Sequence, residues 1–194
     1  MRKLVLSMVV SVDGYINGVG GEFIPPQWSA DLDRWTGTMI ERFDTLLYGR
    51  SSWQEMAAFW PAAETAEETP EPHRRLARFM NSARKIVFSR SMTDASAWNH
   101  STVTSNPIRD VIEAERQRDG KDMVLFAGAR FAQTALRAQV IDEYWLLTMP
   151  EVFGGGTRLF DNHHHRTALE LIEARTMDTG AVLTRYRCLG SITP

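Results

Sequence analysis

The sequence predicts an α/β fold in which a mainly parallel central sheet lies between two layers of helices. Short apolar segments alternate with segments of helical periodicity through the middle of the chain, which is typical of parallel sheets. The first apolar segment, residues 4–12, shows little polar alternation, as expected of a strand that is buried on both faces. Near the C-terminus, Asp178-Thr179-Gly180 separates two strand-like segments and predicts an antiparallel hairpin.

The composition is that of a globular protein. The chain has 194 residues, 43% hydrophobic and 24% charged, which suits a single domain over residues 1–194 with its own core. The net charge of -2 provides no basic field for nucleic acid. The single cysteine, Cys188, excludes an internal disulfide and fits a reducing compartment. No apolar run reaches the length of a membrane span, so we expect a cytoplasmic protein.

The elements of the first half follow from local signals. The first strand ends at the turn Asp13-Gly14, and a glycine-rich loop leads to Ser29, which has the chemistry of a helix N-cap. The apolar face of the helix that follows consists of Leu32, Trp35, Met39, Ile40 and Phe43. A short strand over residues 45–48 ends at Gly49-Arg50, and Ser51-Ser52 are expected to cap the next helix.

The second half repeats this alternation. The acidic, proline-containing segment 64–72 is expected to be a mobile loop. After it, we expect a helix over residues 76–80, strands over 85–89 and 102–104, a helix from 106 to about 116, a strand over 123–127, a helix to about 137, a strand over 141–148, a loop over 150–156, and hairpin strands over 168–177 and 181–189.

Small or basic residues follow three of the predicted strands. The three segments are Gly49-Arg50-Ser51-Ser52, Ser89-Arg90-Ser91 and Gly128-Ala129-Arg130. Ligands of parallel sheets bind beyond the carboxyl ends of the strands, and arginine forks with free amides at a helix start suit phosphate groups. One extended ligand with several phosphates would account for all three segments.

A conformational explanation stands beside this one, because Gly and Ser are common in strand-to-helix turns for steric reasons alone. The chain has no G-x-G-x-x-G after its first strand and no Walker A motif. The residues by themselves therefore indicate an anionic ligand, of which a nucleotide is one example.

The order of the motifs resembles the dihydrofolate reductase-like family. Residues 47–56 (LYGRSSWQEM) are similar to the G-R-x-T/S-W/Y-E segment of dihydrofolate reductases, and residues 124–130 (VLFAGAR) are similar to their glycine turn. Residues 11–16 (SVDGYI) and 141–143 (IDE), followed by Gly154-Gly155-Gly156, are closer to the riboflavin-pathway reductase branch, which is RibD C-terminal domain-like.

This resemblance implies a three-layer αβα fold that binds NADPH along its strand ends. It places Arg50 and Ser51 near the adenosine 2′-phosphate, with Gly49 and Ser52 in the same turn. It places Ser89, Arg90 and Ser91 on the adenine side. It places Gly128, Ala129 and Arg130 at the pyrophosphate, where the family often has two adjacent glycines and this chain has one. The implied activity is that of an NADPH-dependent reductase, as in 5-amino-6-(5-phosphoribosylamino)uracil reductase, acting on a pterin- or pyrimidine-like or carbonyl substrate.

Candidates for the substrate side are acids, aromatic rings and glycines. Asp13 and Asp31 are the candidate catalytic acids, although a turn former and a helix-start acid would have the same residue types. Trp28 and Trp53 are candidates for binding a planar ring, against the alternative of simple core residues. Gly154 and Gly155 fit close approach to a ligand and a flexible turn equally well.

Other hypotheses remain open from the sequence. A non-catalytic NADPH-binding sensor on the same fold would share the nucleotide motifs, and a dimeric scaffold could use Tyr144 and Trp145 as interface anchors. A homodimer is expected under each hypothesis. The tract His163-His164-His165 is expected to be an exposed polar loop, and we expect no metal site.

Overall fold

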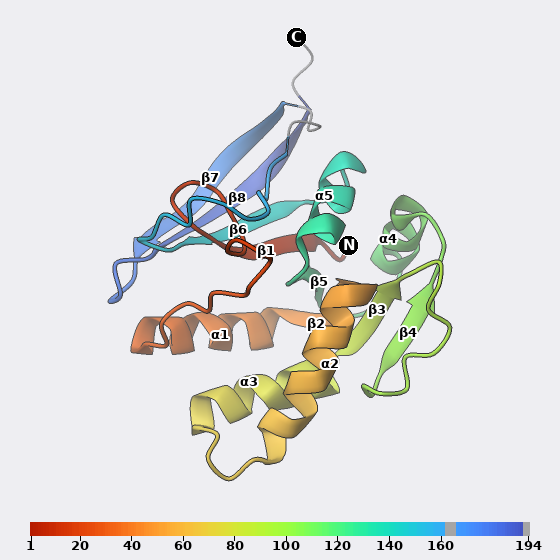
Figure 1. The fold of residues 1–194 in the computed structure, drawn as a ribbon. Helices are drawn as coiled ribbons and strands as arrows, with labels where there is room; N and C mark the ends of the chain where they lie inside the picture. The colour runs from red at the N-terminus through yellow and green to blue at the C-terminus, as the bar shows by residue number, and fades with distance from the viewer. Residues whose placement is uncertain (162–165, 192–194) are drawn as a thin grey trace.

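The computed structural model describes residues 1–161 and 166–191, and over these residues it contains eight strands and five helices (Figure 1). In chain order they are β1 (Leu4–Val10), α1 (Ala30–Arg42), β2 (Phe43–Gly49), α2 (Arg50–Thr65), α3 (Glu71–Ser82), β3 (Arg84–Phe88), β4 (Ser101–Thr104), α4 (Ile108–Arg116), β5 (Asp122–Leu125), α5 (Ala129–Arg137), β6 (Glu143–Thr148), β7 (Thr167–Thr176) and β8 (Val182–Ser191). The histidine tract lies outside the described residues.

The strands form one sheet in the order β4-β3-β2-β5-β1-β6-β8-β7. The pairs from β4 through β6 are parallel, whereas β8 runs antiparallel to β6 and β7 antiparallel to β8. The carboxyl ends of the six parallel strands therefore lie on a single edge, which we call the carboxyl edge; the opposite edge is the amino edge. The predicted fold class, with its mainly parallel sheet and C-terminal antiparallel hairpin, is confirmed.

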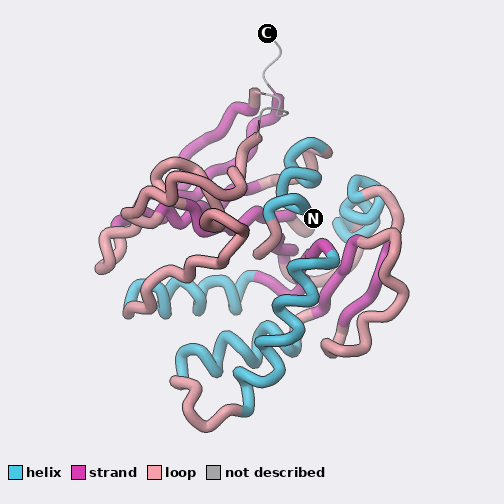
Figure 2. The backbone as a smooth tube through the Cα atoms, viewed as in Figure 1, coloured by secondary structure: helices cyan, strands magenta, loops and turns pink. Residues whose placement is uncertain are grey.

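Helices cover both faces of the sheet, as Figures 1 and 2 show. One buried cluster joins the sheet to α1, α2 and α3 and includes Trp35, Met39 and Trp145. The other joins it to α4 and α5 and includes Ile112 and Phe131. Strands between two helical layers are buried on both faces, which explains why their sequences are continuously apolar.

The boundaries of two predicted elements are wrong. Helix α2 continues to Thr65 with Pro61 inside it, and α3 begins at Glu71, so the loop expected over residues 64–72 is only a short connection between them. Phe43, predicted on the face of the first helix, is instead the first residue of β2 and is buried there. Proline and acidic residues favour loops locally, but the packing of α2 against α3 overrides that preference.

Strand β7 forms one edge of the sheet and exposes Leu169, Leu171 and Ile172. The expected homodimer stays a prediction.

Among the described residues, no helix is both long and apolar enough to span a membrane.

Candidate functional site

The turns after β2 and β5 touch each other at the carboxyl edge. A Cβ atom added to Gly128 would lie 2.7 Å from Ser52 Oγ, and one added to Gly49 would lie 3.1 Å from the Cβ atom of Phe131. Gly128 also has φ +95°, a conformation that side chains disfavour. Two segments far apart in sequence, both predicted to bind the same ligand, are therefore neighbours in space.

Helices α2 and α5 begin at this contact, and their first turns differ from those of the other described helices. Neither has a side-chain N-cap bond or an acidic residue in its first turn in the structure as described. By contrast, α1 is capped by Ser29 and carries two acids in its first turn, and α3 and α4 each begin with one acid. Uncapped amides and the helix dipole favour an anion at the starts of α2 and α5.

Three arginines at this edge have exposed side chains without a carboxylate partner among the described residues: Arg50, Arg90 and Arg130. Arg50 Nη1 donates to Ser91 Oγ at 3.0 Å, which links the turn after β2 to the turn after β3. Ser89 Oγ accepts from the amides of Ser91 and Met92, so it orders the same turn. The structure thus brings all three predicted strand ends to one surface.

The hydroxyls predicted on the turn after β2 differ in their surroundings. Ser52 is buried and donates to the carbonyl oxygen of Gly49 at 3.1 Å, so its hydroxyl stabilises the turn. Ser51 is exposed in the first turn of α2. The expected serine cap is wrong, because Gly49 is the N-cap residue and both serines lie inside the helix. Ala129 lies half-buried at the start of α5.

Asp13 holds the loop after β6. Its carboxylate accepts from Ser11 Oγ at 2.6 Å and from the amides of Phe153 and Gly154 at 3.1 and 2.9 Å. The Ser11 hydroxyl, followed by these amides, keeps the pKa of Asp13 below its usual value, although burial opposes them. A carboxylate held in this way accepts hydrogen bonds and does not readily supply a proton.

Asp31 joins the start of α1 to the β7–β8 hairpin. Its Oδ2 atom accepts from the Asp178 amide at 2.8 Å and its Oδ1 atom from Arg34 at 2.5 Å. These two hydrogen bonds, the amide first, lower the pKa of Asp31. Both predicted acids are therefore anions engaged by the protein itself, and their catalytic role stays a prediction.

The two predicted tryptophans lie in different environments. Trp53 is buried in the core, and its Nε1 atom donates to Ser101 Oγ at 3.0 Å, so it has no surface with which to bind a planar substrate. Trp28 is half-buried just before α1, with its ring centroid 3.8 Å from that of His73. The role predicted for Trp53 is therefore corrected to a structural one.

The glycines after β6 are part of a loop contact. Gly154 has φ +69°, and a Cβ atom on Gly155 would lie 2.9 Å from Val19 Cγ2. Ile16 donates to the carbonyl oxygen of Thr157, which pairs this loop with the loop after β1. The positive φ of Gly154 and the close packing of Gly155 against Val19 are sufficient to explain the two glycines.

An apolar groove of about 50 Å³ lies on the α1 side of the β6 carboxyl end. We call it the α1 groove; it is lined by Pro26, Gln27, Leu32, Leu147, Met149, Pro150, Glu151, Met177, Thr179 and Ala181. It is a second surface at the carboxyl edge, next to the surface formed by the three strand-end turns.

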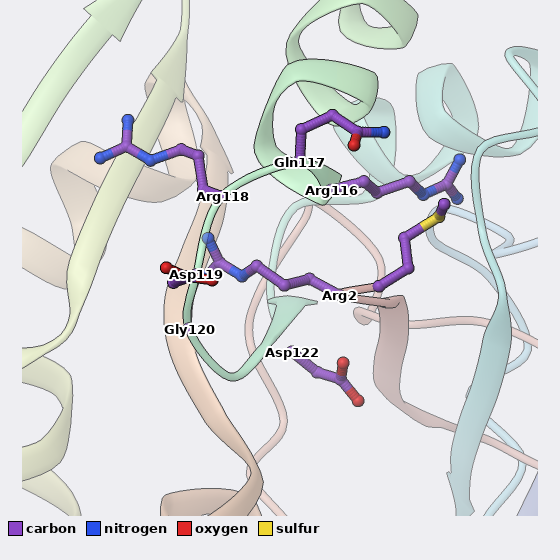
Figure 3. Close-up of a pocket in the computed structure, with 8 residues that line it drawn as sticks. Arg2, Arg116, Gln117, Arg118, Asp119, Gly120 and Asp122 are labelled. Carbon is purple, nitrogen blue, oxygen red and sulfur yellow. The ribbon is translucent and has the colours of Figure 1, made fainter.

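A larger cavity, of about 420 Å³, lies on the amino edge (Figure 3). Arg2, Arg116 and Arg118 line it, but each forms an ion pair with a carboxylate. Because these arginines are already paired, the cavity is a poor anion site despite its size. The strand-end turns of the carboxyl edge are the better candidates for binding an anion.

The sequence profile of the RibD C-terminal domain family matches residues 2–183. The chain belongs to the RibD C-terminal domain family. A relative in Bacillus subtilis (strain 168), the uncharacterized protein YyaP, is 29% identical over 190 residues, which cover 97% of this chain and 96% of the relative.

Two solved structures show the same fold. A putative riboflavin biosynthesis protein from Shewanella sp. PV-4 has a TM-score of 0.72 at 20% identity, over 97% of this chain and 99% of that one. A diaminohydroxyphosphoribosylaminopyrimidine deaminase/5-amino-6-(5-phosphoribosylamino)uracil reductase from Thermotoga maritima has a TM-score of 0.65 at 16% identity, over 96% of this chain and 56% of that one.

Sequence reasoning missed two features of the site in this family member. Phe131, in the first turn of α5, stacks on Phe88 with ring centroids 4.9 Å apart and packs beneath Gly49. Glu151 lines the α1 groove as an exposed acid. The aromatic residue directly after Gly128-Ala129-Arg130 was a signal for the first, whereas no local pattern marks the second.

Proposed function

We propose that this RibD C-terminal domain protein is an NADPH-dependent reductase that transfers a hydride to a small heterocyclic (pterin- or pyrimidine-like) or carbonyl substrate. Membership of the family supports an oxidoreductase in general. The observation that carries the cofactor assignment is the meeting of two uncapped helix starts with three exposed arginines at one edge. A dinucleotide with a pyrophosphate and a 2′-phosphate has the charge and length to use all of them.

The residues present fit such a cofactor. Gly128 allows the tight turn at φ +95° that packs against Ser52, and the free amides at the start of α5, with Arg130, would hold the pyrophosphate. Arg50 and Ser51 would hold the 2′-phosphate, with Arg90 beside the adenine. When bound, NADPH supplies the hydride, and the protein contributes binding and orientation.

The proton that completes a reduction has a separate source in this proposal. Asp13 and Asp31 each accept hydrogen bonds from backbone amides, and the pKa of each carboxyl is lowered, which disfavours either as the proton donor. We assign the proton to solvent and give Asp13 and Asp31 the positioning of the loop after β6 and of the C-terminal hairpin.

The cofactor assignment is tested with Arg50→Ala. The change should weaken NADPH binding about tenfold or more and NADH binding much less, because a charge-assisted hydrogen bond to the 2′-phosphate is lost. Arg118→Ala, an equal change of charge at an exposed arginine of the amino edge, is the matched control and should leave both affinities unchanged. Titration calorimetry measures all four values; equal losses for NADPH and NADH would remove the assigned role of Arg50.

A non-catalytic NADPH sensor is the second candidate, favoured by the two engaged acids. The sensor would bind NADPH with the same dependence on Arg50 but would not consume it. Oxidation of NADPH, followed by its absorbance across pterins, pyrimidines, quinones and aldehydes, separates the two candidates.

A further inference from the structure

The carboxyl edge is divided into two electrostatic halves. The half formed by the ends of β2, β3 and β5 carries Arg50, Arg90 and Arg130. The half formed by the ends of β1 and β6 and the start of β8 contains the α1 groove. A substrate that lies beside the cofactor would meet this second half, because the strand ends are contiguous along the sheet.

The α1 groove contains no positive group. None of the ten described residues that line it is a Lys, Arg or His, and its one charged residue is Glu151. Glu151 lines the groove as an exposed residue, and its backbone carbonyl oxygen accepts from the Val12 amide.

The arginines of α1 and α3 are already engaged by carboxylates. Arg34 pairs with Asp31 at 2.5 Å, and Arg75 pairs with Asp33 at 2.6 Å. A phosphate in the groove would have to compete with these carboxylates for a cation and would lie close to Glu151. Like charges at close range oppose binding and act as a device of specificity.

The shape of the α1 groove favours the same class of ligand as its charge. The groove encloses about 50 Å³ between apolar walls from Leu32, Leu147, Met149 and Met177, and Pro26 and Pro150 stiffen its rim. The hydrogen bond from the Asp178 amide to Asp31 fixes the hairpin turn at one end of it. A space of this size accepts the edge of a flat ring; Gln27 and Thr179 can donate hydrogen bonds to such a ring, but none of the described lining residues is a cation for a phosphate.

We propose that the hydride acceptor of this protein is an uncharged, flat heterocycle without a phosphate group, held with its ring edge in the α1 groove. The inference rests on the proposed reductase function and narrows its substrate class. It also separates this chain from the Thermotoga protein, whose name describes a reductase of a phosphoribosylated compound.

The test compares riboflavin with flavin mononucleotide, which share a ring system and differ by one phosphate. Binding of each to the NADP⁺-loaded protein is measured by quenching of flavin fluorescence. Riboflavin should bind about tenfold more tightly, and the difference should shrink as salt screens Glu151. Equal affinities, tighter binding of the phosphorylated flavin, or binding of neither would overturn the proposal.

Glu151→Lys sharpens the test by reversing the charge at the groove. It should tighten flavin mononucleotide binding several-fold and leave riboflavin nearly unchanged. Glu41→Lys, at an exposed position near the amino-edge end of α1, is the matched control and should change neither affinity. If Glu151→Lys fails to improve binding of the phosphorylated flavin, the groove is not where the flavin binds.

NADPH binding is measured separately on the same preparations. Loss of the flavin preference with intact NADPH binding contradicts only the substrate class. Failure of the protein to bind NADPH contradicts the proposed reductase itself.

Discussion

The two edges of the sheet carry the same residue type, arginine, in opposite electrostatic situations. At the amino edge, Arg2 pairs with Asp44 and Glu115, and Arg84 pairs with Glu115 at 2.6 Å. At the carboxyl edge, Arg50 and Arg130 have no carboxylate partner in the described part of the chain. An arginine paired with a carboxylate is structural, whereas an arginine without such a partner is available to a ligand. The size of the neighbouring cavity does not distinguish the two.

The largest loss of stability is expected from a substitution at the amino edge. Glu115→Ala leaves Arg2, a buried cation, without one of its two carboxylates and removes the partner of Arg84. The free energy of unfolding should fall by about 3–5 kcal/mol, while NADPH affinity stays the same. Denaturation in urea measures the loss, and Glu113→Ala, at an exposed acid, serves as the control with a loss below about 1 kcal/mol. A weakened NADPH affinity in Glu115→Ala would break the division between the edges.

The amino edge should also determine stability in acid. Burial raises the pKa of Glu143, but hydrogen bonds from Lys3, Arg42 and Trp145 outweigh it and lower the pKa to about 2. The folded pKa lies below the unfolded value of 4.5, so this stabilisation is complete above pH 4.5 and is lost as the pH falls toward 2.

Unfolding in urea between pH 2.5 and 7 tests this contribution, which is at most about 3 kcal/mol. Glu143→Gln should flatten the acid limb of the stability profile, and Glu41→Gln, at an exposed acid, should not. An unchanged limb in Glu143→Gln would place the acid sensitivity elsewhere.

A smaller loss of stability is expected at the carboxyl edge from Gly128→Ala. The substituted residue would have to keep φ +95°, and its Cβ atom would lie 2.7 Å from Ser52 Oγ. The free energy of unfolding should fall by about 1–3 kcal/mol, and NADPH binding should weaken because the turn shifts. Gly37→Ala in α1 is the matched control, since its Cβ atom would lie 3.7 Å from Arg75, an ordinary contact. Thermal unfolding and NADPH titration of both variants measure the difference; an unchanged NADPH affinity would mean that the turn does not touch the cofactor.

The smallest effect on stability is expected from Arg90→Ala. Its exposed side chain has no ion pair in the structure as described, so the free energy of unfolding should change by less than about 0.5 kcal/mol. NADPH affinity should fall a few-fold, and its salt dependence should weaken. A stability loss as large as that of Gly128→Ala would show that Arg90 has a structural partner.

Sequence patterns predicted the parallel sheet and the strand-end turns because both are written in local signals. Continuous apolar runs mark strands covered on both faces, and Gly49 and Gly128 mark the sharp turns after them. The sequence left Trp53 open between a ring-binding and a core position, and it did not predict the length of α2, because both depend on contacts between α2 and segments distant in sequence, such as Ser101 and α3. The engagement of Asp31 by the Asp178 amide, 147 residues away, is equally non-local.

The location of bound NADPH tests the central claim most directly. In crystals grown with NADPH, we predict the 2′-phosphate at Arg50 and the pyrophosphate at the start of α5, beside Gly128. Binding of NADPH in the larger amino-edge cavity, among Arg2, Arg116 and Arg118, would contradict the account.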